Sequence, residues 1–546
     1  MAAVRRDAVV KLKPALLLAA AASLLWGAAA MAAPRPRDTP LPVLTPTLSP
    51  ARANAWRLVS GQWRFGEGIL EQEMPERLAA AILTTPVFAD FRLTAEVNIR
   101  GVGSGVRAAA ILFRATGTLS YYWLHLDARN NQAILVRSAP DNPWIELARR
   151  PLPIRQDTWH TVQVECAGPR LTVHFDDAPV FSVTDSALVA GRVGFGTSQG
   201  RVAFRALRVE GRPVKGSKPL KNEHPPYQVI SRGEAAGPYQ AFPDVCRLKN
   251  GDLLCVFYAG YGHVSLPNAE WPKGGRICLV RSRDEGRTWS PPRILFDGEQ
   301  DDRDPHIAQL SDGTLLCSFF SYWSEAGKIR FGTCLVASRD GGETWDTQSR
   351  MVLPNWACSA PVREMKDGTY LLGVYTEENG KAWGGVIRST DRGQTWSAPI
   401  PIGKDAGVSL DAETDVIPLK DGTLFAALRS SQVNQHYALS PDLGLTWSPV
   451  QDIGFKGHCP HLTRLRNGAI LLTQRLPGTA LYVSRDEAKS WQGPYALDSV
   501  IGAYPSTVEL KDGSVLVVYY EEGEGSAIRA LRFRLKKDGI EPLAFR

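Results

Sequence analysis

A phrase of the form Ser-x-Asp-x-Gly-x-Thr-Trp constrains the fold of this chain more than any other feature. It first occurs as "SRDEGRTWS" from Ser282 and returns four times, the last copy, "SRDEAKSWQ" from Ser484, being degenerate. The tryptophans of the five copies are 56, 51, 51 and 44 residues apart. A period of this length, filled with short strands, is typical of a β-propeller with one four-stranded blade per repeat.

A second repeated feature, a tight turn such as "KNGDLL" or "KDGTLF", alternates with the first. Asn-Gly and Asp-Gly between apolar runs are strong signals for β-hairpins. The turn glycines are Gly251, Gly313, Gly368, Gly422, Gly468 and Gly513. Six hairpins predict six blades for residues 225–546. The last blade lacks a fourth strand of its own, so we expect "YQVISR", residues 227–232, to supply it and close the ring.

The repeated phrase itself is predicted to be scaffold, because a single active site does not need five copies. At a turn between the third and fourth strands of a blade, its Asp and Ser can bind backbone amides and its Gly can adopt a positive φ. The phrase resembles the Asp-box, or BNR repeat, of the sialidase (neuraminidase) family. That resemblance implies a six-bladed propeller and says little about activity.

The first half of the chain has a different pattern. Residues 54–210 read as short alternating strands, which predicts a β-sandwich and makes the whole chain all-β. The phrases "DTWHTVQVECAGPRLTVHFDD" and "GRVGFGTSQGRVAFRALRVEG" resemble laminin-G-like and concanavalin-type jelly rolls found beside bacterial glycosidases. Trp123, Trp144 and Trp159 are more simply explained as sandwich core than as sugar-stacking platforms. A lysine-bearing linker, residues 211–224, follows.

The N-terminus predicts export. Residues 1–33 combine a basic start with an apolar run and small residues, as in a signal peptide, and a proline-rich linker follows at 34–53. We therefore expect a secreted or periplasmic protein, or a membrane-anchored one if the signal is not cleaved. Export permits disulfides between the eight cysteines, although buried thiols explain them equally well.

Composition excludes several classes of function. The net charge is +7 and no long basic run stands in either half, so nucleic acid is not an expected partner. No Cys-x-x-Cys pair indicates zinc, and no Gly-rich phosphate loop precedes a helix. We predict no metal and no cofactor.

Functional residues are expected where equivalent positions of the blades differ. The start of the first strand and the end of the second lie at one end of a hairpin, opposite the Gly turn. Ten residues before the glycines stand Ala241, Arg303, Cys358, Ala412, His458 and Ala503. Nine before stand Phe242, Asp304, Ser359, Glu413, Cys459 and Tyr504. Seven after stand Tyr258, Phe320, Tyr375, Arg429, Arg475 and Tyr520. These sets predict charged rings around one mouth of the channel.

At these positions the resemblance to sialidases becomes specific. Glu413 and Arg429 bracket "ETDVIPLKDGTLFAALR", Arg475 ends "LLTQR", and Tyr504 opens the last blade. The family implies a retaining glycosidase in which Tyr504 attacks the anomeric carbon, Glu413 takes the phenol proton, and arginines bind the sugar carboxylate. A neutral tyrosine avoids the repulsion that a carboxylate nucleophile would meet at a carbon already bearing a carboxylate. The planar fork of arginine suits a carboxylate.

Blade one departs from the family pattern. Ala241 stands where sialidases have their first arginine. The following loop, "YAGYGHVSLPNAEWPKGG", has no Asp, and His263 and Glu270 are its only proton donors of the right type. Blade two instead carries "DDRDPHIAQLSDG", in which Arg303 and Asp304 occupy the ring positions ten and nine residues before the turn glycine.

We therefore predict a sialidase-like glycoside hydrolase for a terminal anionic sugar, sialic acid or a uronate, of glycans. Its catalytic residues are Tyr504, Glu413 and Asp304. Its substrate-binding residues are Arg303, Arg429, Arg475 and His458. Two alternatives remain open: a polysaccharide lyase that uses Tyr504 or His458 as base on a uronic acid, and a glycan-binding propeller without catalysis.

Overall fold

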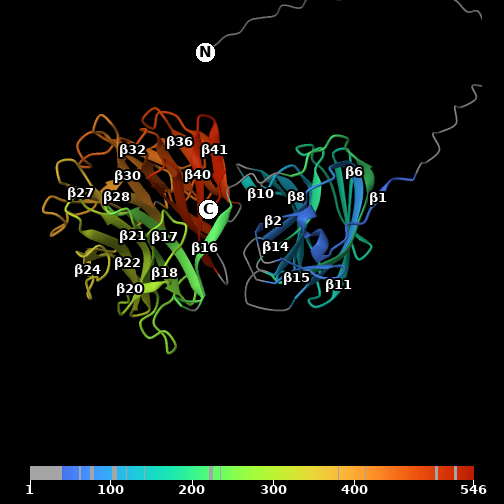
Figure 1. The fold of residues 1–546 in the computed structure, drawn as a ribbon, viewed down its shortest axis with the longest axis horizontal. Helices are drawn as coiled ribbons and strands as arrows, with labels where there is room; N and C mark the ends of the chain where they lie inside the picture. Colours follow the sequence, from blue (N-terminus) through green and yellow to red (C-terminus); the bar gives the residue numbers. More distant parts are fainter. Residues whose placement is uncertain are drawn as a thin grey trace, which may run out of the picture. The chain divides into compact units, whose positions relative to one another are not determined.

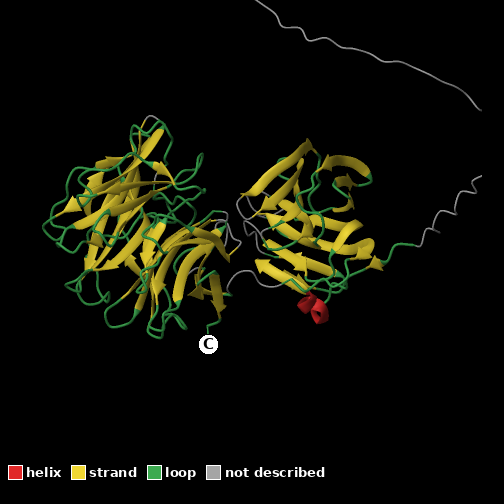
Figure 2. Cartoon of the chain, turned by 90° about the horizontal axis from the view of Figure 1, so that it is seen from above, coloured by secondary structure: helices red, strands yellow, loops and turns green. Residues whose placement is uncertain are grey.

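The computed structural model describes residues 40–545, apart from 61–62, 74–78, 101–106, 119, 140–141, 199, 221–225, 234, 379, 412, 477, 499–501 and 522–525. The predicted signal peptide, residues 1–33, and the first part of the proline-rich linker, residues 34–39, lie outside this range, as does Ala412. Strands and loops make up nearly all of the described chain, with one short 3₁₀ helix, η1 (Pro50–Ala55), drawn in red (Figure 2). Within the described ranges, no helix is long and apolar enough to cross a bilayer.

The first half folds as the predicted β-sandwich of two antiparallel sheets. One sheet, counted over the described residues, has the order β13-β12-β11-β6-β15-β4-β3, with β1 paired to β15. Its strands are β1 (Val43–Leu44), β3 (Trp63–Phe65), β4 (Ile69–Gln72), β6 (Phe88–Ile99), β11 (Trp159–Ala167), β12 (Arg170–Phe175), β13 (Ala178–Thr184) and β15 (Val202–Pro213).

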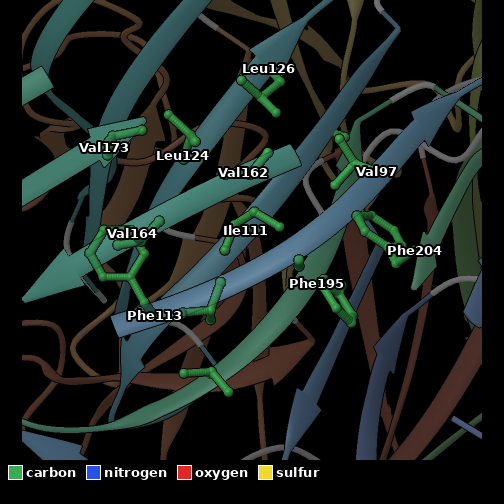
Figure 3. Close-up of a cluster of buried hydrophobic side chains, with 14 of the residues drawn as sticks. Val97, Ile111, Phe113, Leu124, Leu126, Val162, Val164, Val173, Phe195 and Phe204 are labelled. Carbon is green, nitrogen blue, oxygen red and sulfur yellow. The ribbon is translucent and has the colours of Figure 1, made fainter. Parts of the chain in front are cut away.

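The second sheet of the sandwich has the order β10-β9-β8-β7-β14-β5-β2. Its strands are β2 (Trp56–Ser60), β5 (Ala79–Leu83), β7 (Ala108–Ala115), β8 (Tyr121–Asp127), β9 (Gln132–Ala139), β10 (Asn142–Pro151) and β14 (Arg192–Ser198). Alternate residues of both sheets, among them Val97, Ile111, Val164 and Phe204, meet in one apolar core (Figure 3). This is the packing that period-two alternation dictates.

The second half folds as six antiparallel sheets, counted over the described residues, in sequence order around a ring (Figure 1). Blade one comprises β17 (Tyr239–Arg247), β18 (Leu253–Gly260), β19 (Arg276–Ser282) and β20 (Arg293–Phe296). Blade two comprises β21 (Asp301–Gln309), β22 (Leu315–Glu325), β23 (Lys328–Ser338) and β24 (Arg350–Pro354). Blade three comprises β25 (Ala357–Cys358), β26 (Arg363–Glu364), β27 (Tyr370–Glu378), β28 (Lys381–Ser389) and β29 (Ile400–Ile402).

The other three blades repeat this arrangement. Blade four comprises β30 (Thr414–Pro418), β31 (Leu424–Leu428), β32 (His436–Ser440) and β33 (Gln451–Asp452). Blade five comprises β34 (His461–Arg464), β35 (Ile470–Gln474), β36 (Thr479–Ser484) and β37 (Gln492–Asp498). Blade six contains β38 (Gly502–Glu509), β39 (Val515–Glu521) and β40 (Ala527–Lys536). The predicted six-bladed propeller is confirmed.

Closure of the ring uses the predicted strand and one more. β16 (Tyr227–Arg232) pairs with β40 over residues 527–531, so a strand from the start of the domain completes the last blade. β41 (Gly539–Leu543) then pairs with residues 532–536 of the same strand. In Figure 1 the green β16 lies beside the red β40 and β41. The outer strand of blade six is therefore built from both ends of the domain.

The repeated phrase occupies the predicted turn. In blade one the Asp284 carboxylate accepts hydrogen bonds from the Thr288 amide at 2.9 Å and the Thr288 hydroxyl at 2.6 Å. The Ser282 hydroxyl accepts the Gly286 amide at 2.9 Å, and Gly286 has a φ of 79°. These bonds close the loop between β19 and β20, so the Asp284 and Ser282 side chains stabilise the turn. The eight cysteines all lie in the described ranges and are free thiols, seven of them buried.

Candidate active site

The backbone brings the predicted ring positions together at one mouth of the propeller. Arg303 pairs with Phe320, and Ala503 with Tyr520. In blade four the Arg429 amide donates to the Glu413 carbonyl at 3.0 Å, and in blade five the Arg475 amide donates to the His458 carbonyl at 3.2 Å. Blade three is shifted by one residue, because Tyr375 pairs with Ala357 rather than Cys358.

Four ring residues share an unusual backbone. Within the described chain, Phe242, Asp304, Cys459 and Tyr504 have φ values of 52°, 48°, 49° and 35°, and each precedes a proline. In blades one, two and six the strand register also shifts here, as in a β-bulge. A positive φ at a non-glycine residue costs about 1–3 kcal/mol and is found where function requires it. Among the described residues of the first strands of blades one, two, five and six, a positive φ at a non-glycine residue occurs only at these ring positions.

Tyr504, Glu413 and Arg429 form one contact group across blades six and four. The Tyr504 hydroxyl donates to Glu413 Oε1, and Arg429 Nη1 donates to the same oxygen at 2.6 Å. Arg429 Nη1 also lies 3.5 Å from the Tyr504 hydroxyl. Glu413 is 2% exposed, whereas Tyr504 and Arg429 are partly open to solvent. Burial and the Glu413 charge raise the pKa of the Tyr504 phenol well above its usual value.

This arrangement gives the phenol a base and a cation at once. Glu413 can accept the proton as Tyr504 reacts, and Arg429 lowers the energy of the phenolate that forms. Asp411, which the sequence analysis did not select, holds the other side of the arginine, with Oδ2 at 3.4 Å from Arg429 Nε. Its position two residues before Glu413 in "DAETD" was the only signal for it.

Asp304 is a buried carboxyl on blade two. Burial, followed by the Glu413 charge, raises its pKa to about 6, although Arg303 acts in the opposite direction. Its Oδ1 has no hydrogen bond and lies 3.9 Å from Arg303 Nε. A carboxyl with such a pKa is protonated in mildly acidic solution and can donate a proton.

Arg303 is enclosed more than the sequence suggests. Its side chain is 7% exposed, and Asp301 Oδ2 lies 3.8 Å from its Nη1. Four aromatic rings surround the guanidinium at 5.6–5.7 Å, those of Phe242, Tyr258, Phe320 and Tyr322. This cage stabilises the cation through the ring faces. Arg303 therefore lies in the floor of the mouth.

Arg475 and His458 lie side by side on blade five. Both nitrogens of His458 and Nε of Arg475 are buried without a hydrogen bond. Burial and the neighbouring Arg429 and Arg475 lower the pKa of His458 to about 4, so its imidazole is neutral near pH 7. A half-buried arginine without a carboxylate partner among the described residues is suited to receive an anion.

The blade-one loop reaches the mouth through His263. The Tyr239 hydroxyl lies 2.9 Å from His263 Nδ1, and the imidazole packs edge-on against Phe242 at 5.3 Å. Asp301 anchors this loop, because Oδ2 accepts the Ser265 amide at 2.9 Å. Glu270 is exposed in a turn capped by Asn268. Asp301 was missed in the sequence because its partners come from another blade.

No group of three or more His, Cys, Asp or Glu side chains suited to a metal occurs among the described residues. In the sandwich, Trp123 is buried, and Trp159 is covered by the Arg205 guanidinium at 4.0 Å. Trp144 is 40% exposed and contacts Trp123 edge-on.

Known families match both halves of the chain. Residues 273–517 match the BNR repeat-like domain, and residues 51–210 match the 3-keto-alpha-glucoside-1,2-lyase-like domain. A curated sialidase of Bacteroides fragilis is 25% identical over 210 residues, which are 35% of this chain and 36% of that protein. The second half is a BNR-repeat propeller of sialidase type. The match thus spans about a third of the curated relative.

Three solved structures are similar to parts of this chain. A Dyadobacter fermentans protein of unknown function is 26% identical, with 57% of this chain and 98% of that chain covered and a TM-score of 0.48. A leech intramolecular trans-sialidase, solved with 2,7-anhydro-Neu5Ac, is 12% identical, with 82% and 94% covered and a TM-score of 0.46. The NanB sialidase of Streptococcus pneumoniae is 13% identical, with 81% and 95% covered and a TM-score of 0.46.

Proposed function

We propose that this protein is an exported retaining glycosidase that removes a terminal anionic sugar, a sialic acid or a uronate, from glycans. The observation that carries the proposal is the contact of Tyr504 with Glu413 and Arg429 at the mouth. A phenol, a base and a cation in one group are what a tyrosine nucleophile requires. The distant similarity to a sialidase supports the same class of reaction.

The reaction would run in two displacements. Tyr504 Oη bonds to the anomeric carbon while Glu413 Oε1 takes its proton, and protonated Asp304 gives a proton to the departing glycosidic oxygen. Ionised Asp304 then removes a proton from water as the water oxygen displaces Tyr504, which recovers its proton from Glu413. Both displacements invert the anomeric carbon, so the configuration is retained.

The assignment of anion binding rests on Arg475, the cation that blade five presents. Among the residues that the structure describes, Arg475 has no carboxylate within hydrogen-bonding distance, unlike Arg429, and His458 beside it is neutral. We assign Arg475 and Arg429 to the sugar carboxylate, with His458 lining the pocket. Arg303 would act from the floor of the mouth, close to Asp304.

Product analysis tests the proposal. Purified protein would be incubated with sialylated and uronate-containing glycans, and released sugars would be identified. Tyr504→Phe should abolish turnover and leave the fold intact, whereas Tyr520→Phe, a buried ring 6.1 Å away, serves as the matched control. Full turnover by Tyr504→Phe would refute the assignment of the nucleophile.

A uronate lyase is the second candidate, because the neutral and unpartnered His458 beside Arg475 could remove the proton next to a uronate carboxylate. A lyase product contains a new double bond and absorbs in the ultraviolet, which hydrolysis products do not. Saturable binding with no product would instead indicate a glycan-binding propeller, in line with the buried Ala241 at the blade-one position.

A further inference from the structure

A buried polar network joins the first strands of blades one, two, five and six. Its centre is Asp244, which is 1% exposed and comes from the first strand of blade one. Oδ2 of Asp244 accepts the Ile307 amide at 2.8 Å, and the Ser506 hydroxyl donates to Oδ1. Two imidazoles face the carboxylate, with His306 Nδ1 at 3.6 Å and His461 Nε2 at 3.5 Å. Burial alone would raise the pKa of Asp244, but these histidines hold it well below its usual range.

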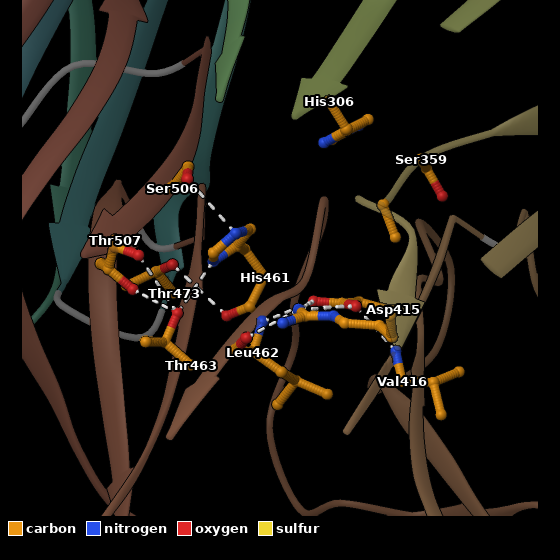
Figure 4. A network of polar contacts seen from close by, with 12 residues as sticks. His306, Ser359, Asp415, Val416, His461, Leu462, Thr463, Thr473, Ser506 and Thr507 are labelled. Carbon is orange, nitrogen blue, oxygen red and sulfur yellow. Dashed lines mark hydrogen bonds and ion pairs between the residues drawn. The ribbon is translucent and has the colours of Figure 1, made fainter. Parts of the chain in front are cut away.

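A small cavity separates this network from the catalytic pair. The volume of the cavity is about 10 Å³. Its lining joins residues of the mouth to residues of the network: Pro243, His306, Ser359, Glu413, Cys459, Pro460, His461, Tyr504, Pro505 and Ser506. Figure 4 shows His306, Ser359, His461 and Ser506 around this space. A volume of this size fits one water molecule and no larger ligand.

Polar side chains of Glu413, His306 and Ser359 line the cavity. Glu413 Oε1 takes two hydrogen bonds, from Tyr504 and Arg429, but Oε2 is buried with none. The His306 imidazole, 9% exposed, also lines the cavity, and its Nδ1 is turned to Asp244 Oδ2 at 3.6 Å. The Ser359 hydroxyl accepts the Thr414 amide at 2.9 Å, which leaves its hydrogen to donate. A carboxylate oxygen buried without a donor is costly, and nearly all such atoms in folded proteins have a partner.

We infer that this cavity binds a single structural water that donates to Glu413 Oε2 and is held in turn by His306 and Ser359. Three polar neighbours match the hydrogen bonds that a buried water makes. With Oε2 fixed from below, the carboxylate plane is set and Oε1 is aimed at the Tyr504 phenol. His306 is then a positioning residue that acts on Glu413 through the water, and Asp244 orients the imidazole.

The kinetic part of the inference rests on the proposed function. His306→Leu removes the polar group that holds the water, so kcat should fall about tenfold, the worth of one hydrogen bond, while KM stays within about twofold. His306→Gln keeps a donor and an acceptor and should recover most of the loss. His436, a buried histidine of blade four whose Nδ1 lies 2.8 Å from the Asn434 carbonyl, provides matched Leu and Gln controls.

A purely structural role for His306 predicts a different result. His306→Leu and His306→Gln would then lose activity in proportion to their loss of thermal stability, as the His436 variants do. Equal kcat values for folded His306→Leu and wild type would also overturn the inference.

A crystal structure of the full chain tests the water without any assay. Wild type should show one ordered water within hydrogen-bonding distance of Glu413 Oε2 and His306, and His306→Leu should lose it. A dry cavity in wild type would overturn the inference even if sugar is released. A bound water in a protein that releases no sugar would support the water site and refute the proposed function instead.

Discussion

Asp304 shows how one residue takes its chemistry from its surroundings. An aspartate in water ionises near pH 4, but burial and the Glu413 charge raise the pKa of Asp304 to about 6. It has a positive φ of 48° and precedes Pro305, at the register shift of strand β21 between Arg303 and His306. The same residue type in the repeated turns has the opposite shift, since hydrogen bonds from Thr395, chiefly its hydroxyl and then its amide, lower the pKa of Asp391 to about 2.

The pKa of Asp304 predicts the pH dependence of activity. The acid form declines as pH rises above about 6, so kcat/KM for a glycan should fall on the alkaline side. Asp304→Asn should lower kcat/KM for natural glycans about 10²–10⁴-fold and should spare aryl glycosides, whose leaving groups need no proton.

The control for Asp304 is its neighbour Asp302, which is also buried but accepts hydrogen bonds from Ser321 at 2.6 Å and Gly298 at 2.9 Å, away from the mouth. Asp302→Asn should leave the ratio of glycan to aryl-glycoside hydrolysis unchanged. If Asp304→Asn slows both substrates equally, another residue, with His263 the next candidate, supplies the proton.

Among the elements, the repeated turn is the most regular, and its departures are informative. Four copies have glycine at the fifth position, with φ values of 79° to 85° at Gly286, Gly342, Gly393 and Gly444. The fifth copy has Ala488 there, with a φ of 61°. A Cβ in this conformation costs about 1–2 kcal/mol, partly offset by the greater freedom of glycine in the unfolded chain.

Ala488→Gly should therefore stabilise the propeller by about 0.5–1 kcal/mol. The midpoint of thermal or urea unfolding measures it. Ala480→Gly, in the extended strand β36 of the same blade, is the matched control. It should destabilise the propeller, because glycine loses more conformational entropy on folding than alanine and relieves no backbone strain in a strand. A lower midpoint for Ala488→Gly would show that packing of the methyl group outweighs the strain.

At the scale of the whole molecule, closure of the ring depends on a buried cation. Arg529 of β40 is 0% exposed and donates to Glu521, with Asp498 of blade five at 3.3 Å. Its guanidinium also lies 4.2 Å from the ring of Tyr227 on the closing strand β16. One side chain thus joins blade five, blade six and the first strand of the domain.

Arg529→Ala should destabilise the propeller by about 3–5 kcal/mol, because it leaves two carboxylates buried without their cation. The loss would appear as an earlier thermal transition. Arg534→Ala, on the same strand but 41% exposed, should change stability by less than about 1 kcal/mol. Similar effects of the two substitutions would contradict a closing role for Arg529.

The sequence by itself determined the architecture, because blades are specified locally. Turn glycines, Asp-Gly hairpins and period-two strands act over a few residues, so six blades, the sandwich and the closing strand at 227–232 could all be predicted. Aligning the blades on their turns also placed Glu413, Arg429 and Tyr504 at one mouth, since the two ends of a hairpin strand pair stay together.

Only the tertiary structure decided which of these residues meet and in what state. The contact of Tyr504 with Glu413 joins positions 91 residues apart across the channel. Asp301 and the pair of Asp244 with His306 escaped the sequence analysis because their partners belong to other blades. Burial, which sets the pKa of Asp304 and encloses Arg303, is a property of the assembled ring, and no local pattern encodes it.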